Sequence, residues 1–404
     1  MSMQPIAYRQ IEGRSSAYYA LLGGLVLFIL FGLSAAYYME EHGHIVTGMN
    51  NQIVWGMPHV FAVFLIVAAS GALNVASIGS VFGKAMYKPL APLSGLLSIA
   101  MLLGGLTVLM LDLGRPDRLI VAMTHFNFKS VFAWNVFLYS GFFAIVAVYL
   151  WTMMERRMNP YTKTAGFAAF IWRLLLTTGT GSIFGFLVAR QAYDSALLAP
   201  MFIIMSFSYG LAVYILVLLA AYRWTGRALG DTVLLRLKKL LVVFIAAVLY
   251  FVAVFHMTNL YFTKHHGIEH FILVDGGIHT QLFWIGQILL GSIVPLALLF
   301  HPKLGKQRCT IALSAALVIL GGLAQMYVTI IGGQAYPLEL FPGMQVTSSF
   351  YDGVVHYYTP SLPEIMLGLG GVAIAGAMVV FGVKILRFLP ESLENQIVDP
   401  HHKS

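Results

Sequence analysis

The sequence predicts an all-α integral membrane protein in which about ten transmembrane helices pack as a bundle. Of its 404 residues, 59% are hydrophobic and 10% are charged, which excludes an ordinary soluble domain. Ten apolar runs reach the length of about 20 residues that a helix needs to cross a bilayer. The longest connection, about residues 333–362, is too short to hold a core of its own. Residues 1–404 are therefore expected to form a single polytopic membrane domain.

The predicted spans follow one another with short connections. In chain order they cover residues 17–38, 53–77, 90–111, 130–153, 164–189, 199–222, 240–262, 280–300, 309–332 and 363–386. The first is expected to be a retained span and not a cleaved signal, because the residues before it are polar and no small-residue cleavage site follows it. Polar side chains interrupt the later spans at His59, Asn135, Arg173, His256, Asn259, Gln281, Gln287 and Glu364. Of these, only Arg173 is a charge placed deep inside a span.

The distribution of basic residues predicts how the chain is threaded. Of its 24 Lys and Arg residues, 18 lie at the two termini or in the loops on the same side. The other side has five, and Arg173 lies within a span. By the positive-inside rule both termini are cytoplasmic, in a multi-pass protein of the bacterial inner membrane. The net charge of +8 thus reflects topology, and no nucleic acid is expected as a partner.

The ionisable segment 111–118 (Leu-Asp-Leu-Gly-Arg-Pro-Asp-Arg) predicts a site at the outer rim of the bilayer. A carboxylate at this depth is costly unless it is paired or used. His59 on the second span and Asn135 and Tyr139 on the fourth lie at a depth similar to that of Asp112. These residue types suit a quinone headgroup, which needs a titratable hydrogen-bond donor, a carboxylate that passes protons, and apolar walls.

Roles in this quinone pocket follow from the chemistry of each group. His59 would bond one quinone oxygen, and Asp112 would exchange its proton with the outer water. Arg115 or Arg118 would support the charge of that carboxylate, and Trp134 would contribute to the walls.

Each of these residues also has a structural explanation. His59 follows Pro58 and so could bond a carbonyl that a proline kink leaves free. Asp112 paired with Arg115 or Arg118 could simply end the third helix.

Two further arrangements use deeper residues. His59 and His256 are the only deep histidine pair for a bis-histidine haem, and the sequence has no Cys-x-x-Cys-His for covalent attachment. Its single cysteine also cannot hold an iron–sulfur cluster, and no metal site is predicted. Arg173, Thr177 and Asp194 outline a proton path along the fifth span. Contacts between neighbouring helices explain the same row equally well.

Several motifs resemble the NrfD/PsrC family of membrane quinone-interacting subunits. They are the Leu-Asp-Leu-Gly-Arg-Pro of residues 111–116, the Asn-Phe-Lys-Ser-Val-Phe-Ala-Trp-Asn of residues 127–135, the Pro58-His59 pair, and the Ile-Gly-Gly-Gln of residues 331–334. The likeness extends over nearly the whole sequence and is greatest to the DsrP type, the integral subunit of DsrMKJOP complexes of dissimilatory sulfur metabolism.

The resemblance implies the helical bundles of that family and its chemistry. Family members carry no haem or cluster and bind quinone near the face on which a ferredoxin-like iron–sulfur subunit docks. His59 and Asp112 match the family's quinone-site histidine and acid, whereas Asn135, Tyr139 and His256 match no motif. In a DsrMKJOP-like complex, the implied partners are a periplasmic ferredoxin-like subunit, cytochrome b-type and c-type subunits and a cytoplasmic iron–sulfur subunit, besides membrane lipid.

The function expected from the sequence is that of a membrane subunit in a respiratory or sulfur-metabolism electron-transfer complex. It would bind menaquinone or ubiquinone near the periplasmic face and exchange electrons with an iron–sulfur partner. Because the chain alone has no electron acceptor, catalysis would belong to the complex. The alternatives are a proton or solute carrier, favoured by the Arg173 row, and a membrane anchor without redox chemistry.

Overall fold

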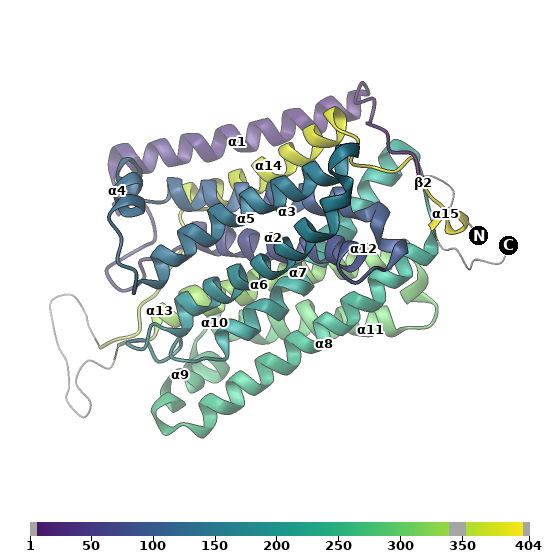
Figure 1. Ribbon diagram of the computed structural model, residues 1–404. Coiled ribbons are helices and arrows are strands. Elements are labelled where there is room, and N and C mark those ends of the chain that lie inside the picture. The colour runs from purple at the N-terminus through teal and green to yellow at the C-terminus, as the bar shows by residue number, and fades with distance from the viewer. Residues whose placement is uncertain (1–5, 339–352, 399–404) are drawn as a thin grey trace.

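Ten long helices run side by side in the computed structural model, which describes residues 6–338 and 353–398 (Figure 1). In the described ranges all ten are long and apolar enough to cross a membrane, which confirms the predicted fold class. Residues 339–352 of the predicted long connection lie outside the described part. The ten spans are α1 (Ser16–His42), α2 (Met57–Ser80), α3 (Ala91–Leu111), α5 (Val131–Met154), α6 (Thr162–Gly185), α7 (Leu198–Thr225), α8 (Asp231–Tyr261), α10 to α11 (Ile278–Phe300), α12 to α13 (Arg308–Ala335) and α14 (Leu362–Ile385).

Two spans are not uniform α-helices. The eighth consists of α10 (Ile278–Gln281), the π-helical η7 (Leu282–Ile293) and α11 (Val294–Phe300). The ninth consists of α12 (Arg308–Tyr327), the π-helical η9 (Val328–Gly332) and α13 (Gly333–Ala335). The connections hold η1 (His44–Val46), η2 (Ala85–Leu90), η3 (Pro116–Arg118), α4 (Leu119–Thr124), η4 (Arg156–Tyr161), η5 (Thr263–His265), α9 (His266–His270), the π-helical η6 (Phe271–Asp275), η8 (Leu304–Lys306) and α15 (Asn395–Val398).

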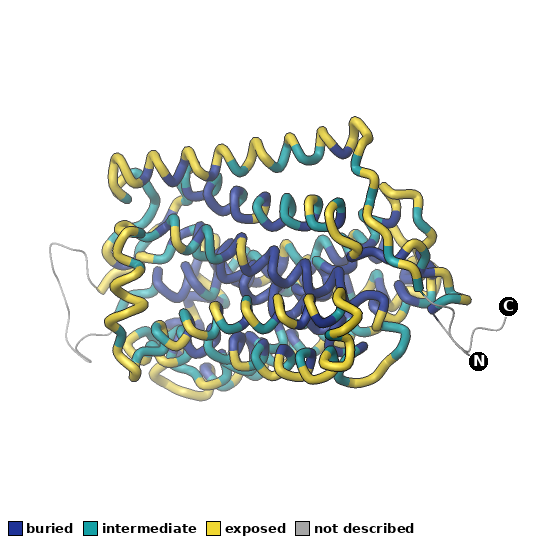
Figure 2. The backbone as a smooth tube through the Cα atoms, turned by 45° about the horizontal axis from the view of Figure 1, so that its top comes forward, coloured by how far each residue is buried: buried dark blue, intermediate teal, exposed yellow. Residues whose placement is uncertain are grey.

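The helix α2 forms the centre of the bundle, and α1 lies at its edge (Figure 2). In their most apolar windows, 94% of the residues of α2 are buried, compared with 11% of those of α1. One group of helices is made by α2, α3, α5 and α6, and a second by α7, α8, η7 and α12. The pair α1 and α14 covers the first group. Since α2 also packs on α7, the two groups share one continuous core.

The crossing of α2 and α7 depends on glycine. A Cβ atom at Gly71 would overlap the carbonyl of Ser206, and one at Gly210 would overlap the backbone of α2. Without side chains at these positions, the two backbones approach closely enough to pack small residues against each other. The crossing joins the first group of helices to the second.

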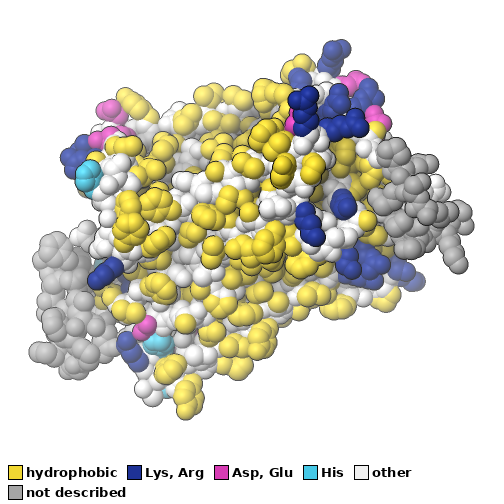
Figure 3. Space-filling view, in the orientation of Figure 1, with side chains coloured by type: hydrophobic (Ala, Val, Ile, Leu, Met, Phe, Trp, Pro, Cys, Tyr) yellow, Lys and Arg dark blue, Asp and Glu magenta, His cyan; other side chains and the backbone are white. Residues whose placement is uncertain are grey.

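The two ends of the bundle differ in charge. At one end, here called the terminal end, β1 (Ala228–Leu229) pairs with β2 (Ser392–Leu393), and Arg227 bonds backbone carbonyls of both terminal segments. Lys and Arg side chains gather at this end on the face shown in Figure 3. The opposite end, here called the site end, carries His59 and Asp112.

Candidate functional site

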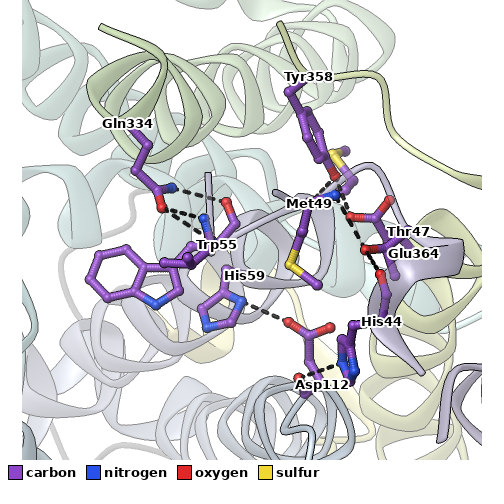
Figure 4. Close-up of polar contacts among 11 residues, drawn as sticks. His44, Thr47, Met49, Trp55, His59, Asp112, Gln334, Tyr358 and Glu364 are labelled. Carbon is purple, nitrogen blue, oxygen red and sulfur yellow. Dashed lines mark hydrogen bonds and ion pairs between the residues drawn. The ribbon is translucent and has the colours of Figure 1, made fainter. Parts of the chain in front are cut away.

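His59 and Asp112 meet at the site end, where α2 begins and α3 ends (Figure 4). Nδ1 of His59 lies 2.8 Å from Oδ2 of Asp112. Pro58 occupies the first turn of α2, where a missing N–H is tolerated, so no kink leaves a free carbonyl for His59 to bond. The kink explanation of His59 is therefore wrong, because the helix begins at Met57 and not near residue 53.

This pair retains unused hydrogen-bonding capacity. The side chain of Asp112 is 1% exposed and that of His59 is 16% exposed. At 2.8 Å the two side chains lie within ion-pair distance. Neither carboxylate oxygen of Asp112, nor Nδ1 of His59, has a hydrogen-bond partner within the described ranges. Because buried polar atoms are nearly always partnered, this geometry suits a polar ligand or water that bonds them.

The arginines of segment 111–118 do not contact Asp112. Arg115 makes two hydrogen bonds of 2.9 and 2.8 Å to Asp117, and this contact holds the pKa of Asp117 below its usual range. Arg118 is exposed. The backbone carbonyl of Asp112 instead lies 3.1 Å from Nε2 of His44. The predicted pairing of Asp112 with Arg115 is wrong, because the chain turns outward after α3 and places the guanidinium in solvent.

An aromatic wall lies beside His59, but Trp134 is not part of it. Trp55 stacks on the imidazole with ring centroids 6.0 Å apart, and it also contacts Phe132 and Phe184. Trp134 is 49% exposed and donates its indole N–H to a carbonyl of the preceding loop. Trp55, on the loop that leads into α2, thus takes the place expected for Trp134.

Gln334 fixes this loop from the second group of helices (Figure 4). Its Oε1 accepts hydrogen bonds from the backbone N–H groups of Val54 and Trp55, at 3.0 and 3.1 Å. Its Nε2 donates to the carbonyls of Trp55 and Ile330, at 3.0 and 2.8 Å. These four bonds use both donors and both acceptor positions of the buried amide. Gln334 therefore sets the position of the indole that covers His59.

Tyr358 and Glu364 hold the same loop from the other side. The Tyr358 hydroxyl donates to Oε1 of Glu364 at 2.6 Å and accepts the N–H of Met57 at 2.6 Å. Oε2 of the fully buried Glu364 accepts the N–H groups of Gly48 and Ser361. Burial, and then the neighbouring carboxylate, raise the pKa of Tyr358, so its hydroxyl stays a donor. The start of α2 is thereby fixed one turn from His59.

Asn135 and Tyr139 belong to the interface of α5 with α6. Nδ2 of Asn135 donates to the carbonyls of Val131 and Gly179, and the Tyr139 hydroxyl lies 3.4 Å from Oγ1 of Thr180. No described contact joins either residue to His59 or Asp112. Asn135 and Tyr139 lie at a membrane depth similar to that of His59, but their side chains point toward α6. They therefore stabilise the packing of α5 on α6.

The residues of the predicted proton path, Arg173, Thr177 and Asp194, have separate structural contacts. Arg173 is 1% exposed, donates to Oδ1 of Asn74 at 3.0 Å and lies over two phenylalanine rings. Thr177 donates its hydroxyl to the carbonyl of Arg173 at 2.8 Å. Asp194 lies beyond the end of α6 and pairs with Lys264 at 3.6 Å. These contacts do not connect Arg173, Thr177 and Asp194 into a path, and they fit the packing explanation.

A second histidine–carboxylate pair lies at the site end of the second group. Nδ1 of His256 is 2.7 Å from Oε2 of Glu269, with side-chain exposures of 15% and 2%. Nδ2 of Asn259 donates to Oε1 of the same carboxylate at 2.8 Å. His59 and His256 therefore each face a carboxylate of their own, on helices of different groups. Glu269 was not identified from the sequence, because it lies on a separate short helix with no fixed spacing from His256.

Comparison with known proteins places this architecture among membrane subunits of oxidoreductases. A family model described as "Polysulphide reductase, NrfD" matches residues 45–337, which include His59, Asp112, His256 and Gln334. The protein is 29% identical to the Hdr-like menaquinol oxidoreductase integral membrane subunit of Archaeoglobus fulgidus, over 98% of this sequence and 99% of that protein. It is 23% identical to a selenate reductase subunit of Mesobacillus selenatarsenatis, over 85% and 88% of the two sequences. It is also 23% identical to a polysulfide reductase subunit of Wolinella succinogenes, over 71% and 96%.

Proposed function

The chain belongs to the NrfD family, and we propose that it is the membrane subunit of an oxidoreductase complex that binds a quinone or quinol beside His59 and Asp112. The names of its relatives, a menaquinol oxidoreductase subunit among them, support this class of complex. Menaquinone is accordingly the quinone we favour over ubiquinone. The chain would supply the quinone site and the complex would supply the electron acceptor or donor.

One observation carries the proposal: a buried carboxylate without a hydrogen-bond partner in the described ranges lies against a half-buried imidazole, under a stacked indole. Oxidation of a quinol releases two electrons and two protons. Asp112 would receive these two protons one after the other from the headgroup hydroxyls and release each to the outer water, while His59 bonds a headgroup oxygen. Trp55 covers one side of the imidazole and limits the access of water. The electrons would leave to an iron–sulfur partner.

Orientation and partners form a finer part of the proposal. Because Lys and Arg gather at the terminal end, we place that end in the cytoplasm and the quinone site near the periplasmic face of the bacterial inner membrane (Figure 3). A periplasmic ferredoxin-like subunit would then dock over the site end. We further propose that the protein is a DsrP-like subunit of a complex of sulfur metabolism. The other members of that complex would be cytochrome b-type, cytochrome c-type and cytoplasmic iron–sulfur subunits.

Quinone counting tests this assignment. We expect lipid extraction of the purified complex to yield bound quinone, and His59→Ala to lower the amount per chain, since it removes a hydrogen-bonding group. His266→Ala is the matched control, because His266 is an exposed histidine at the same end. An unchanged quinone content in His59→Ala would contradict the site. The absence of quinone in both samples would favour a carrier or an anchor.

A further inference from the structure

The pair His256–Glu269 is the end of an ordered series of hydrogen bonds. Since Nδ2 of Asn259 donates to Glu269, its Oδ1 is the acceptor of the 3.1 Å contact with Nδ1 of His265. His265 therefore carries its proton on Nδ1. In the same way, the carboxylate accepts from Nδ1 of His256, which leaves Nε2 as the free nitrogen of that ring. The series thus runs from His265 through Asn259 and Glu269 to His256.

A small cavity with both polar and apolar lining adjoins this series. It has a volume of about 40 Å³ and is lined by His256, Asn259 and Glu269, and by Gln287 and Gln325 from the eighth and ninth spans. Gln287 is 5% exposed, and it lines both this cavity and a smaller one beside it. A buried polar side chain at a cavity wall suits a polar ligand.

The backbone around the cavity is unusual. All three π-helical segments of the described residues supply lining side chains, among them Ile272 of η6, Phe283 of η7 and Val328 of η9. Wider π turns commonly mark functional sites in helical proteins. The first site has none of these turns, since α2 and α3 are regular where they hold His59 and Asp112.

The cavity has room for water. A single water needs about 10–15 Å³ of such space together with two to four polar partners. A second cavity of about 10 Å³ shares Gln287 and Gln325 and extends toward Ser208, Tyr209 and Ser292. Water in the two cavities would form a chain from His256 toward Ser208 and Ser292, beside the side chains of Gln287 and Gln325.

We propose that His256 and Glu269 form a proton-binding site, in which Nε2 of His256 takes up a proton that water in the cavity relays from the solution at the site end, and the carboxylate of Glu269 stabilises the resulting imidazolium. The site is separate from the quinone site and does not depend on the quinone assignment. Its ligands are water and a proton.

The charged and titratable groups around the site support exchange with the solution at the site end. His265 is buried, and burial lowers its pKa, so it remains a neutral hydrogen-bond donor. Beside it, Asp194 and Lys264 form a partly exposed ion pair at 3.6 Å, with side-chain exposures of 33% and 58%. On the inner side, the hydroxyl of Tyr209 donates to Gln325. Among the described residues, Glu269 is therefore the one carboxylate in direct contact with His256.

Nitrogen-15 NMR of the histidine-labelled full-length protein in lipid bilayers tests the site, with His256→Gln used to assign the signal. We expect an imidazolium signal from His256 in the wild-type protein and loss of this signal in Glu269→Gln, because an amide cannot balance the charge of the imidazolium. Asp112→Asn is the reciprocal control, in which the His256 signal is expected to keep its wild-type behaviour.

Gln287→Met keeps the side-chain volume and removes an amide that lines the cavity, so it tests the water without removing a charge. We expect it to abolish magnetisation transfer from water to His256 in a folded protein. The proposal is overturned by an imidazolium signal that persists in Glu269→Gln, by water transfer that persists in Gln287→Met, or by a loss of extractable quinone in Glu269→Gln, which would make the cavity part of a quinone site.

Discussion

The two halves of the bundle place the same pair of groups, an imidazole and a buried carboxylate, in different surroundings. The distances are 2.8 Å for His59 and Asp112 and 2.7 Å for His256 and Glu269, and the exposures are similar. In the first pair the carboxylate oxygens lack hydrogen bonds within the described ranges, and an indole stacks on the ring. In the second pair both oxygens accept hydrogen bonds and a small cavity adjoins the ring. The neighbours of a pair, more than its two residues, determine which ligand it suits.

The strongest test of this comparison is Asp112→Asn. The variant keeps the side-chain size but cannot take a proton from the headgroup. We expect quinol oxidation by the complex to fall at least about 100-fold, the usual contribution of a positioned acid or base. Co-purification of the other subunits should stay normal, since Asp112 is buried and its described contacts are with His59 and His44 of the same bundle.

Asp117→Asn is its matched control, because Asp117 is an exposed carboxylate five residues farther along the same loop. Its rate of quinol oxidation should stay within about twofold of the wild-type rate. Glu269→Gln in the same assay should cause a smaller loss than Asp112→Asn. Equal losses in these two variants would show that both pairs serve the quinol reaction and would remove the distinction between them.

Gln334→Leu tests the four hydrogen bonds by which Gln334 holds the loop beside the first pair. Loss of four hydrogen bonds frees Val54 and Trp55, so the indole no longer holds its place over His59. We expect the KM for quinol to rise about tenfold, with a smaller change in kcat, since unsatisfied buried amides cost about 1–3 kcal/mol. Steady-state kinetics with a soluble quinol would measure both constants. Gln281→Ala, at an exposed glutamine, should behave as wild type.

Tyr358→Phe removes the hydroxyl that holds the same loop from its other side, and it leaves the N–H of Met57 without its acceptor. We expect a lower thermal unfolding temperature, corresponding to about 1–2 kcal/mol. The pKa of Tyr358 is raised in the folded protein, so the unfolded protein loses this proton first as the pH rises. The stability advantage of wild type over Tyr358→Phe should therefore be complete below about pH 10 and shrink above it.

The smallest effect is expected for Arg115→Gln. Its guanidinium pairs with Asp117 in solvent and not with the buried carboxylate of Asp112. Quinol turnover should stay within about twofold of wild type, as is usual for exposed ion pairs. A large loss would mean that Arg115 reaches the site in the assembled complex, and the first pair would then differ from the second in charge as well as in hydrogen bonding.

The sequence by itself determined the helices and one pair. About 20 apolar residues can satisfy their backbone in a bilayer only as a helix, so all ten spans could be located from composition. His59 and Asp112 could be placed at one depth because each lies at a span end, and their motif pointed to the family.

Only the tertiary structure decided which side chains meet at that depth. Helix rotation and loop path put Trp55 on His59, turn Asn135 toward α6 and send Arg115 to Asp117. The contacts of Gln334 and Glu269 join segments that no periodicity relates, since both reach across loops. In a bundle whose spans are apolar on every face, hydrophobic pattern fixes depth along the axis but does not fix rotation about it.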